Sequence, residues 1–332
     1  MYSKLICVAI YLFLLGTSDV NGDFLFKFGW YKTYPNGSRT EVSEISSLDK
    51  AIIGDTKYLK LKAKIPVLFP GSVKNIEHLE ILKLVSCNVH TILPQAFRDI
   101  PNISMIALND NKIKGIKTGI FNNLNVSTIL LHRNKIQFIE SEAFDNMTRL
   151  IKLQLNSNFI SYWDNNWFKN TPQLSELYFR RNAIRTIPSR AFKNVPARNR
   201  KLKIYLSKNY ISSLEQDAFY GLKECGQIWL DRNEIVDLNE RLLADMEYLE
   251  VLILAKNFLS SVPNKLCNHL KSDLISLDLT NNNNLTCLDY ELVQKVKLTN
   301  VQKIRGLDCG CIKNLKNKFV NNSQNNEINS DC

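Results

Sequence analysis

The 332-residue sequence lacks the short motifs that identify the common enzyme classes. It contains no G-x-S-x-G, no G-x-x-x-x-G-K-[ST], no H-E-x-x-H and no G-x-G-x-x-G. Its four histidines, His78, His90, His132 and His269, are dispersed along the chain, and no Cys/His or Ser/His pair has a plausible catalytic spacing. We therefore expect neither an enzyme nor a bound cofactor or metal.

Long hydrophobic runs are missing after the first residues. The apolar segment from Leu5 to Leu15 is too short to cross a bilayer, and small and polar residues follow it. This pattern predicts a secretory signal peptide over residues 1–22, cleaved after Gly22 or, as the second choice, after Ser18. The C-terminal stretch lacks the hydrophobic tail of a lipid-anchor signal. We expect a secreted, extracellular protein with no membrane span.

Glycosylation signals and charge fit this compartment. The chain carries 43 Lys and Arg against 32 Asp and Glu, a net charge of +11, which favours acidic surfaces and polyanions in general. N-x-S/T sequons predict a glycoprotein modified at Asn36, Asn102, Asn125, Asn146, Asn284 and Asn321.

An internal repeat dominates the sequence. The pattern L-x-x-L-x-L-x-x-N occurs nine times, at steps of 23 to 27 residues. We call its last position the anchor; the anchors are Cys87, Asn111, Asn134, Asn158, Asn182, Asn209, Asn233, Asn257 and Asn282. An aliphatic residue recurs two positions after the anchor, and phenylalanine stands ten positions after it in six repeats. These ladders are expected to be structural: leucines and phenylalanines fill the core, and each asparagine pairs backbone groups at a turn.

The repeat resembles the extracellular leucine-rich-repeat family, and in particular secreted proteins similar to Toll ectodomains without a transmembrane or intracellular part. The resemblance covers residues 58–286 and implies an α/β solenoid of about nine to ten repeats. Such a solenoid is a curved horseshoe with a parallel β-sheet on its concave side. Residues 23–57 are expected to form a cysteine-free N-terminal cap built on a β-hairpin, and residues 287–332 a disulfide-bonded C-terminal cap and basic polar tail.

Two of the cysteines fall on core positions of the repeat. Cys87 occupies an anchor and Cys225 a leucine position, so both are expected to be buried and unpaired. They lie six repeats apart, roughly 29 Å at the spacing of adjacent strands, which is beyond the reach of a disulfide. The cysteines expected to stabilise the C-terminal cap are Cys267, Cys287, Cys309, Cys311 and Cys332.

Pairing within the cap is left open by the sequence. The best pair is Cys267 with Cys287, which lie on adjacent coils, and the second is Cys332 with either Cys309 or Cys311. One cysteine then remains, and it is either free or links two chains in a disulfide-bonded dimer. A zinc site is disfavoured, because the Cys-Gly-Cys sequence has no matching set of histidines.

Side chains between the leucines of each strand point away from the core, because strand residues alternate. On three consecutive strands these outward positions predict an aromatic row of Tyr178, Tyr205 and Trp229. Exposed Tyr, Trp and Arg are typical of binding hot spots. The candidate ligand-binding residues are Leu130, His132, Tyr178, Arg180, Arg181, Lys203, Tyr205, Trp229 and Asp231. A basic edge, one residue before the anchors, consists of Arg133, Arg181, Lys208, Arg232 and Lys256.

Three functions of different classes remain open. The leading one is a binding module that recognises an extracellular protein or glycoprotein through the concave face, and the family resemblance implies an innate-immune recognition factor or decoy. The second is a polyanion binder, for glycosaminoglycans or nucleic acid, and the third an extracellular matrix or adhesion component. The longest repeat also inserts Arg198, Arg200 and Lys201, which either widen the patch or are a tolerated surface insertion.

Overall fold

A computed structural model of the chain describes residues 26–34, 39–45, 47–271, 274–289, 292, 296–298 and 310–311. The expected signal peptide at residues 1–22 lies outside these ranges, as do the sequons at Asn36 and Asn321 and the cysteines Cys309 and Cys332. Among the described residues, no helix combines the length and apolar character needed to cross a membrane.

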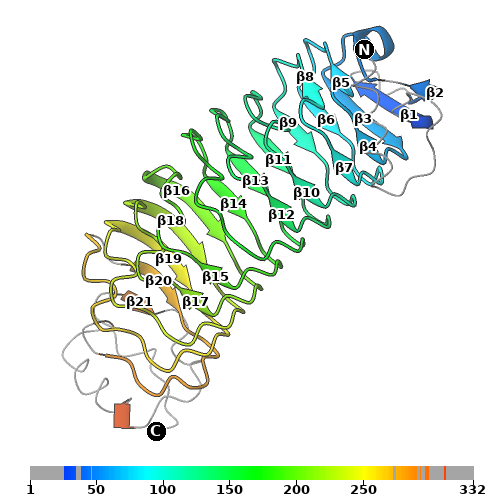
Figure 1. Ribbon diagram of the computed structural model, residues 1–332. Helices are drawn as coiled ribbons and strands as arrows, with labels where there is room; N and C mark the ends of the chain where they lie inside the picture. The colour runs from blue at the N-terminus through cyan, green and yellow to red at the C-terminus, as the bar shows by residue number, and fades with distance from the viewer. Residues whose placement is uncertain are drawn as a thin grey trace, which may run out of the picture.

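One β-sheet runs along the whole stack of coils (Figure 1). In the described part of the chain it has 13 strands in the order β2-β1-β3-β6-β9-β11-β13-β14-β16-β18-β19-β20-β21. Their bounds are β1 Phe26–Tyr34, β2 Arg39–Ile45, β3 Tyr58–Ala63, β6 Ile81–Lys83, β9 Met105–Ala107, β11 Thr128–Leu130, β13 Lys152–Gln154, β14 Glu176–Tyr178, β16 Arg198–Tyr205, β18 Glu224–Trp229, β19 Tyr248–Ile253, β20 Leu274–Asp278 and β21 Val296–Leu298. The strands from β3 onward are parallel, whereas β1 pairs antiparallel with both β2 and β3.

Shorter elements lie in the segments between these strands. A four-residue helix, α2, spans Lys50–Ile53 and precedes the first coil. Two-stranded parallel ladders join neighbouring coils; they pair β4 (Val67–Leu68) with β7 (Thr91–Ile92), β5 (Val73–Lys74) with β8 (Phe97–Arg98), β10 (Gly115–Ile116) with β12 (Phe138–Ile139), and β15 (Thr186–Ile187) with β17 (Ser213–Leu214).

The core is a stack of similar layers, because residues at equivalent positions of successive coils lie side by side. Leu153, Leu177 and Ile204 pair in register and are fully buried. On the opposite wall the ring of Phe121 stacks on those of Phe97 and Phe144, at centroid distances of 5.9 and 6.1 Å. Each coil therefore buries its apolar face only against its neighbours, which is the expected solenoid.

Two tryptophans change this stack in the middle of the molecule. Trp163 and Trp167 are buried and place an aromatic cluster between Phe168 and Phe192, with the Trp163 ring 6.1 and 4.8 Å from those two rings. Phe179, which replaces the usual leucine, packs flat against Trp167 at 5.9 Å. At this point the core is filled by larger side chains than in the other repeats.

The anchor asparagines connect every coil to the coil before it. The Nδ2 group of Asn182 donates to the carbonyl oxygens of Leu155 and Phe179, both at 3.0 Å. Its Oδ1 atom accepts the backbone N–H of Ile160 at 3.1 Å. The same arrangement recurs along the ladder, and these asparagines are buried. The predicted structural role of the anchors is confirmed.

The two core cysteines are buried free thiols, as expected. Cys87 takes the anchor position of its repeat, and its thiol donates to the carbonyl oxygen of Leu61 at 3.4 Å. Burial raises the pKa of both thiols, that of Cys225 to about 12. A thiol with such a pKa stays protonated and is unreactive at neutral pH.

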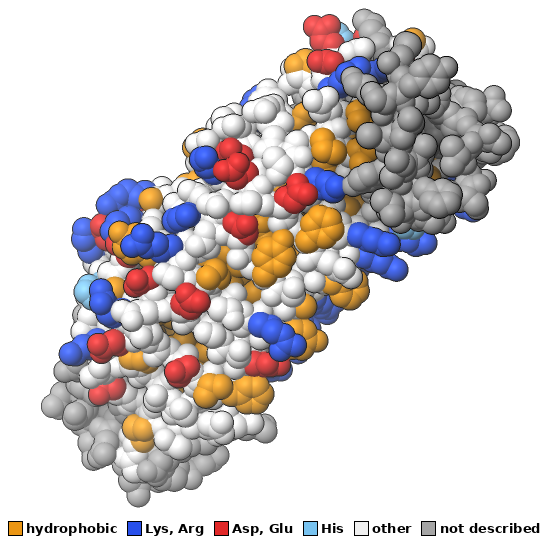
Figure 2. Space-filling model, viewed as in Figure 1, with side chains coloured by type: hydrophobic (Ala, Val, Ile, Leu, Met, Phe, Trp, Pro, Cys, Tyr) orange, Lys and Arg blue, Asp and Glu red, His pale blue; other side chains and the backbone are white. Residues whose placement is uncertain are grey.

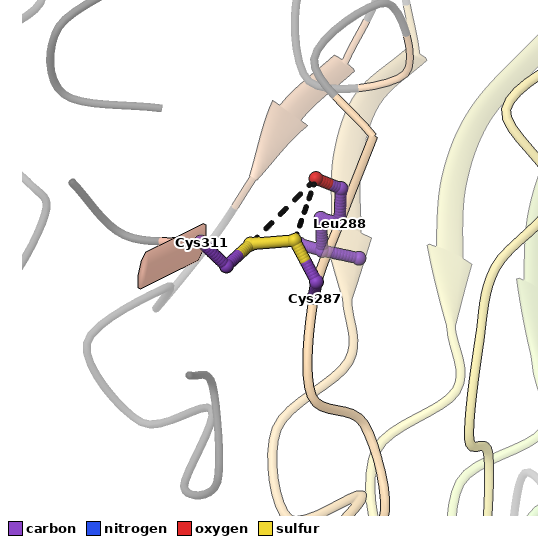
Figure 3. Close-up of a disulfide and its surroundings, with 3 residues drawn as sticks. All are labelled: Cys287, Leu288 and Cys311. Carbon is purple, nitrogen blue, oxygen red and sulfur yellow. Dashed lines mark hydrogen bonds between the residues drawn. A yellow bond between two sulfur atoms is a disulfide. The ribbon is translucent and has the colours of Figure 1, made fainter. Parts of the chain in front are cut away.

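The C-terminal disulfide differs from the predicted pair. Cys287 is bonded to Cys311, so the expected Cys267–Cys287 bond is wrong, and so is the alternative in which Cys311 pairs with Cys332 (Figure 3). Both sulfur atoms lie near the carbonyl oxygen of Leu288, at 3.5 Å from Cys287 and 3.9 Å from Cys311. Cys267 instead stands at the phenylalanine position of its repeat and is buried there as a core residue. The disulfide therefore ties the last coil to the segment that follows the solenoid.

Replacing one anchor should reveal how much the asparagine ladder stabilises the fold. The substitution Asn182→Ala removes three hydrogen bonds. It leaves the buried N–H of Ile160 without a partner, whereas the carbonyl oxygens of Leu155 and Phe179 keep the amides of Asn158 and Asn209. We therefore expect the free energy of unfolding to fall by about 2 kcal/mol. The matched control is Asn156→Ala, whose side chain accepts one exposed bond from the backbone of Arg180; it should cost less than about 1 kcal/mol. Urea unfolding followed by circular dichroism measures both, and equal losses would contradict the structural role of the ladder.

Candidate ligand-binding face

The predicted aromatic row exists as a continuous stack on the solvent-facing side of the main sheet. Tyr178, Tyr205 and Trp229 are partners in register on β14, β16 and β18. The rings of Tyr178 and Tyr205 are 4.6 Å apart and nearly parallel, with an interplanar angle of 8°. The rings of Tyr205 and Trp229 are 5.6 Å apart and tilted by 35°. The row therefore presents ring edges, since its ring faces largely cover one another.

Polar side chains from the same strands hold this stack in place. Lys152 lies over the ring of Tyr178, with its Nζ atom 4.8 Å from the centroid, and pairs with Glu176 at 2.9 Å. The hydroxyl of Tyr178 donates to Glu176 at 2.8 Å. At the other end of the row, Nε1 of Trp229 donates to the Gln227 side chain at 3.2 Å. The aromatic row thus has its rotamers fixed before any ligand arrives.

These contacts determine the protonation of the row. Partial burial alone would raise the pKa of Glu176, but hydrogen bonds from Lys152 and Tyr178 outweigh it and lower that pKa. Burial and the nearby Glu176 carboxylate raise the pKa of Tyr178 and of Tyr205. Glu176 is therefore ionised and both phenols are neutral across the physiological range, so the row offers neutral aromatic groups beside one paired acid.

The other predicted ligand-binding residues lie around the row at different distances. Lys203 is the register partner of Glu176 and sits beside the row. Arg180 and Asp231 follow Tyr178 and Trp229 by two positions, and Arg181 lies at the edge of the sheet. Leu130 shares the register of Tyr178 but Gln154 separates the two, and His132 is likewise two strands from Arg180. Burial lowers the pKa of His132, an effect that Asp110 opposes and Arg133 reinforces.

Sequence reasoning missed the residues that support the row. Lys152, Glu176 and Gln227 occupy the other outward position of their strands, two residues before Gln154, Tyr178 and Trp229 respectively. The same alternation that identified the aromatic row also places these side chains on the sheet face. An alignment of both outward positions, rather than of one, would have found them.

The inserted segment of the longest repeat lies in β16, where the register with β18 shifts between Asn199 and Lys203. Arg198 pairs with Glu224 at 3.2 Å and with Glu247 at 3.1 Å, while Arg200 pairs with Glu224 at 3.1 Å. Arg198 thus pairs with acids of the next two coils, and Arg200 with an acid of the next coil. For Arg198 and Arg200, the structure favours a tolerated extension of the strands over additional free cations beside the aromatic row.

The described sequon asparagines, Asn102, Asn125, Asn146 and Asn284, are all exposed. The Nδ2 groups of Asn102 and Asn125 donate to the carbonyl oxygens of Glu77 and Pro101 in the preceding coils. Neither belongs to the outward positions of the sheet. Glycans at these two positions would leave the aromatic row uncovered, and glycosylation itself stays a prediction.

Two family models match the chain. A model described as a BspA-type leucine-rich repeat region matches residues 69–199 in six copies, and a leucine-rich-repeat model matches residues 202–257. The chain therefore belongs to the leucine-rich-repeat proteins, whose solenoid is typically a binding scaffold. No curated protein sequence matches it.

Several solved structures share the fold. The Drosophila Toll–Spatzle complex matches with a TM-score of 0.54 at 18% identity, over 67% of this chain and 29% of that one. A leucine-rich-repeat protein of Leptospira interrogans matches with a TM-score of 0.50 at 16% identity, over 74% and 68% of the two chains. A complex of TLR13 with ssRNA13 matches with a TM-score of 0.48 at 20% identity, over 68% and 35%. This chain thus spans about a third of the two receptor chains, and at these identities the likeness concerns the fold alone.

The ion-pair network beside the insertion should make stability depend on pH. Hydrogen bonds from Lys271 and Arg198 lower the pKa of Glu247 to about 2. Because this pKa is depressed in the folded state, its stabilisation is complete above the ordinary value of 4.5 and is lost as the pH falls toward 2. The melting temperature of Glu247→Gln should therefore lie below that of the unsubstituted protein at pH 6, and the difference should vanish near pH 2. The control is Glu240→Gln, an exposed acid without an ion pair among the described residues; a difference for Glu247→Gln that is the same at every pH would refute this assignment.

Proposed function

We propose that the protein is a secreted glycoprotein that recognises a protein or glycoprotein ligand through its concave face, the solvent-facing side of the main sheet. Tyr178, Tyr205 and Trp229 form the centre of the proposed site. The observation that carries the proposal is the stacked aromatic row, which is the one run of three aromatic side chains along adjacent strands of the described sheet. Tyr and Trp are the residues that most often dominate the energetics of protein interfaces.

The packing of the row supports binding to a macromolecule rather than to a flat small molecule. Its ring faces are occupied by one another, so the accessible parts are ring edges and the tips of the side chains. A protein surface can close around the aromatic row and desolvate it, whereas a ligand that requires a free ring face cannot stack there. Because hydrogen bonds and ring stacking already fix the rotamers, little conformational entropy is lost on binding.

Charge around the row indicates what the ligand should carry. Arg180, Arg181 and Lys203 surround it, whereas Glu176 is already neutralised by Lys152. The remaining nearby acid is Asp231, whose closest ion pair, at 3.9 Å, is with Arg232. A ligand surface with acidic side chains around an apolar centre would complement this arrangement.

The solved relative with a bound protein fits the proposal. Toll is seen in a complex with Spatzle, and this complex is described as a molecular hub in Drosophila development and innate immunity. By analogy, this chain would act in innate immunity as a soluble recognition factor or decoy. This part of the proposal rests on family resemblance, because a shared fold does not by itself transfer a ligand.

The proposal predicts that loss of the row abolishes capture while the fold is retained. The double variant Tyr178→Ala, Trp229→Ala should bind a partner isolated from extracellular fluid at least about 30-fold more weakly, since a hot spot is worth about 2 kcal/mol or more. The matched control is Tyr220→Ala, an exposed tyrosine that lies over Arg190 outside the main sheet; it should leave the affinity within about threefold.

Surface plasmon resonance with the purified partner measures both affinities, and circular dichroism confirms that each variant is folded. Unchanged binding of the double variant would refute the proposed site. Equal losses from the double variant and from Tyr220→Ala would instead place the ligand elsewhere on the solenoid.

A further inference from the structure

The most exposed apolar side chains do not lie on the aromatic row but along one edge of the sheet. Of the eight large hydrophobic side chains exposed in the described residues, six follow an anchor by one to four positions. They are Phe138, Phe159, Tyr162, Tyr210, Val236 and Phe258. Phe159, Tyr210 and Phe258 directly follow an anchor, recur on every second coil and are 55%, 50% and 53% exposed. In the described part of the chain no ring pair includes Phe159 or Phe258, whereas the guanidinium of Arg185 lies over the ring of Tyr210 at 5.8 Å.

Cations occupy the same edge, one on each of four consecutive coils. Arg181, Lys208, Arg232 and Lys256 directly precede their anchors. Together with Phe159, Tyr210 and Phe258 they form what we call the edge ridge. Figure 2 shows basic and hydrophobic side chains side by side on this side of the solenoid, where Figure 1 places the short strands that follow the main sheet. At about 4.8 Å for each coil, the ridge from Phe159 to Phe258 is roughly 20 Å long.

The backbone of these four residues adopts one repeated conformation. All four have a left-handed conformation, with φ of 57° or 58°. The N–H of Arg181 donates to the carbonyl oxygen of Ser207, and that of Lys208 to Asp231, at 3.0 and 2.9 Å. Arg232 and Lys256 repeat this bond with Ala255 and Thr280 at 2.8 and 2.7 Å. A non-glycine residue pays a small conformational penalty to sit in this region, and the bond between coils offsets it.

The charges of the ridge are largely uncompensated. In the described part of the chain, Arg181, Lys208 and Lys256 form no ion pair, and Arg232 reaches only Asp231, at 3.9 Å. Burial lowers the pKa of Lys208, and repulsion from Arg181 and Arg232 lowers it further. Like charges that recur on neighbouring coils repel one another, and an anion that contacts several of them at once relieves this repulsion.

We propose that the edge ridge binds a linear sulfated glycan, which lies along the solenoid axis with its anionic groups on the cations and its sugar rings against Phe159, Tyr210 and Phe258. The geometry of the edge ridge fits a linear chain with charges at regular intervals, because the ridge presents one cation on each of four consecutive coils. A sulfated glycan is chosen over a nucleic acid because the signal peptide and sequons predict an extracellular protein. The ridge contains none of the aromatic residues of the row and shares only Arg181 with its surroundings, and its extracellular setting rests on the proposed function.

The test uses fluorescein-labelled heparin oligosaccharide and fluorescence anisotropy on the full chain. The ridge variant is Arg181→Asn, Lys208→Asn, Arg232→Asn, Lys256→Asn, because asparagine tolerates the left-handed conformation and already stands at this position in Asn281. It should bind at least tenfold more weakly and with a shallower dependence on salt, since fewer counterions are released. The control, Arg149→Gln, Lys193→Gln, Arg241→Gln, Lys265→Gln, removes the same charge from other exposed sites and should change the affinity less than threefold.

Two further arms separate the ridge from general charge attraction. The variant Phe159→Ala, Tyr210→Ala, Phe258→Ala should weaken heparin binding about threefold or more without changing the salt slope, whereas Tyr178→Ala, Trp229→Ala should leave it unchanged. Desulfated heparin should bind at least tenfold more weakly than heparin. Equal losses from the ridge variant and its charge control would overturn the proposal. Tighter binding of an oligo(dT) of equal length would also overturn it and identify a nucleic-acid site instead.

Discussion

The hydrogen bonds of the anchor asparagines are the constraint on which the remaining structure depends. Each amide bonds carbonyl groups of its own coil and of the coil before it, and accepts an N–H from that earlier coil. A strand that ends and turns away from the sheet would otherwise leave these backbone groups buried without partners. The side chain thus permits a sharp turn at the same place in every repeat. Because the turn recurs, the leucines, phenylalanines and outward residues of neighbouring coils come into register.

That register explains why the two surfaces of the solenoid differ. On the sheet face, equivalent positions lie close enough for Tyr178, Tyr205 and Trp229 to stack on one another. Each ring face is therefore partly covered by the neighbouring ring. At the edge, the chain turns outward and the rings of Phe159 and Phe258 have no such neighbours. The same repetition therefore yields a preformed row on one surface and separated, exposed rings on the other. The two surfaces are suited to ligands of different shape.

The regular part of the fold could be predicted from the sequence because the same residue types recur wherever the same local environment recurs. Leu177 and Asn182 follow a pattern seen in nine copies, and their burial and bonding match it. Features that occur once could not be derived in this way. The Cys287–Cys311 bond depends on how the chain returns after the last coil, and Trp163 enters the core from a position that other repeats leave to smaller residues.

The candidate site was predicted in part, for a related reason. Alternation along a strand identified the aromatic row, but not that its ring faces would be covered or that Lys152 and Glu176 would hold it. The left-handed conformation of Arg181, Lys208, Arg232 and Lys256 also could not be predicted from their residue types, since arginine and lysine do not favour it. These properties arise from contacts between coils, and a single repeat does not contain them.

The central claim is that ladder residues build the scaffold and outward residues bind the ligand. The most direct measurement is a saturation scan of β14, β16 and β18 in which surface display and ligand capture are scored separately. Substitutions at Leu177, Ile204 and Ile228 should abolish display, whereas substitutions at Tyr178, Tyr205 and Trp229 should preserve display and reduce capture. Loss of display at the aromatic positions, to the extent seen at the ladder positions, would show that the row is part of the scaffold and would contradict the account.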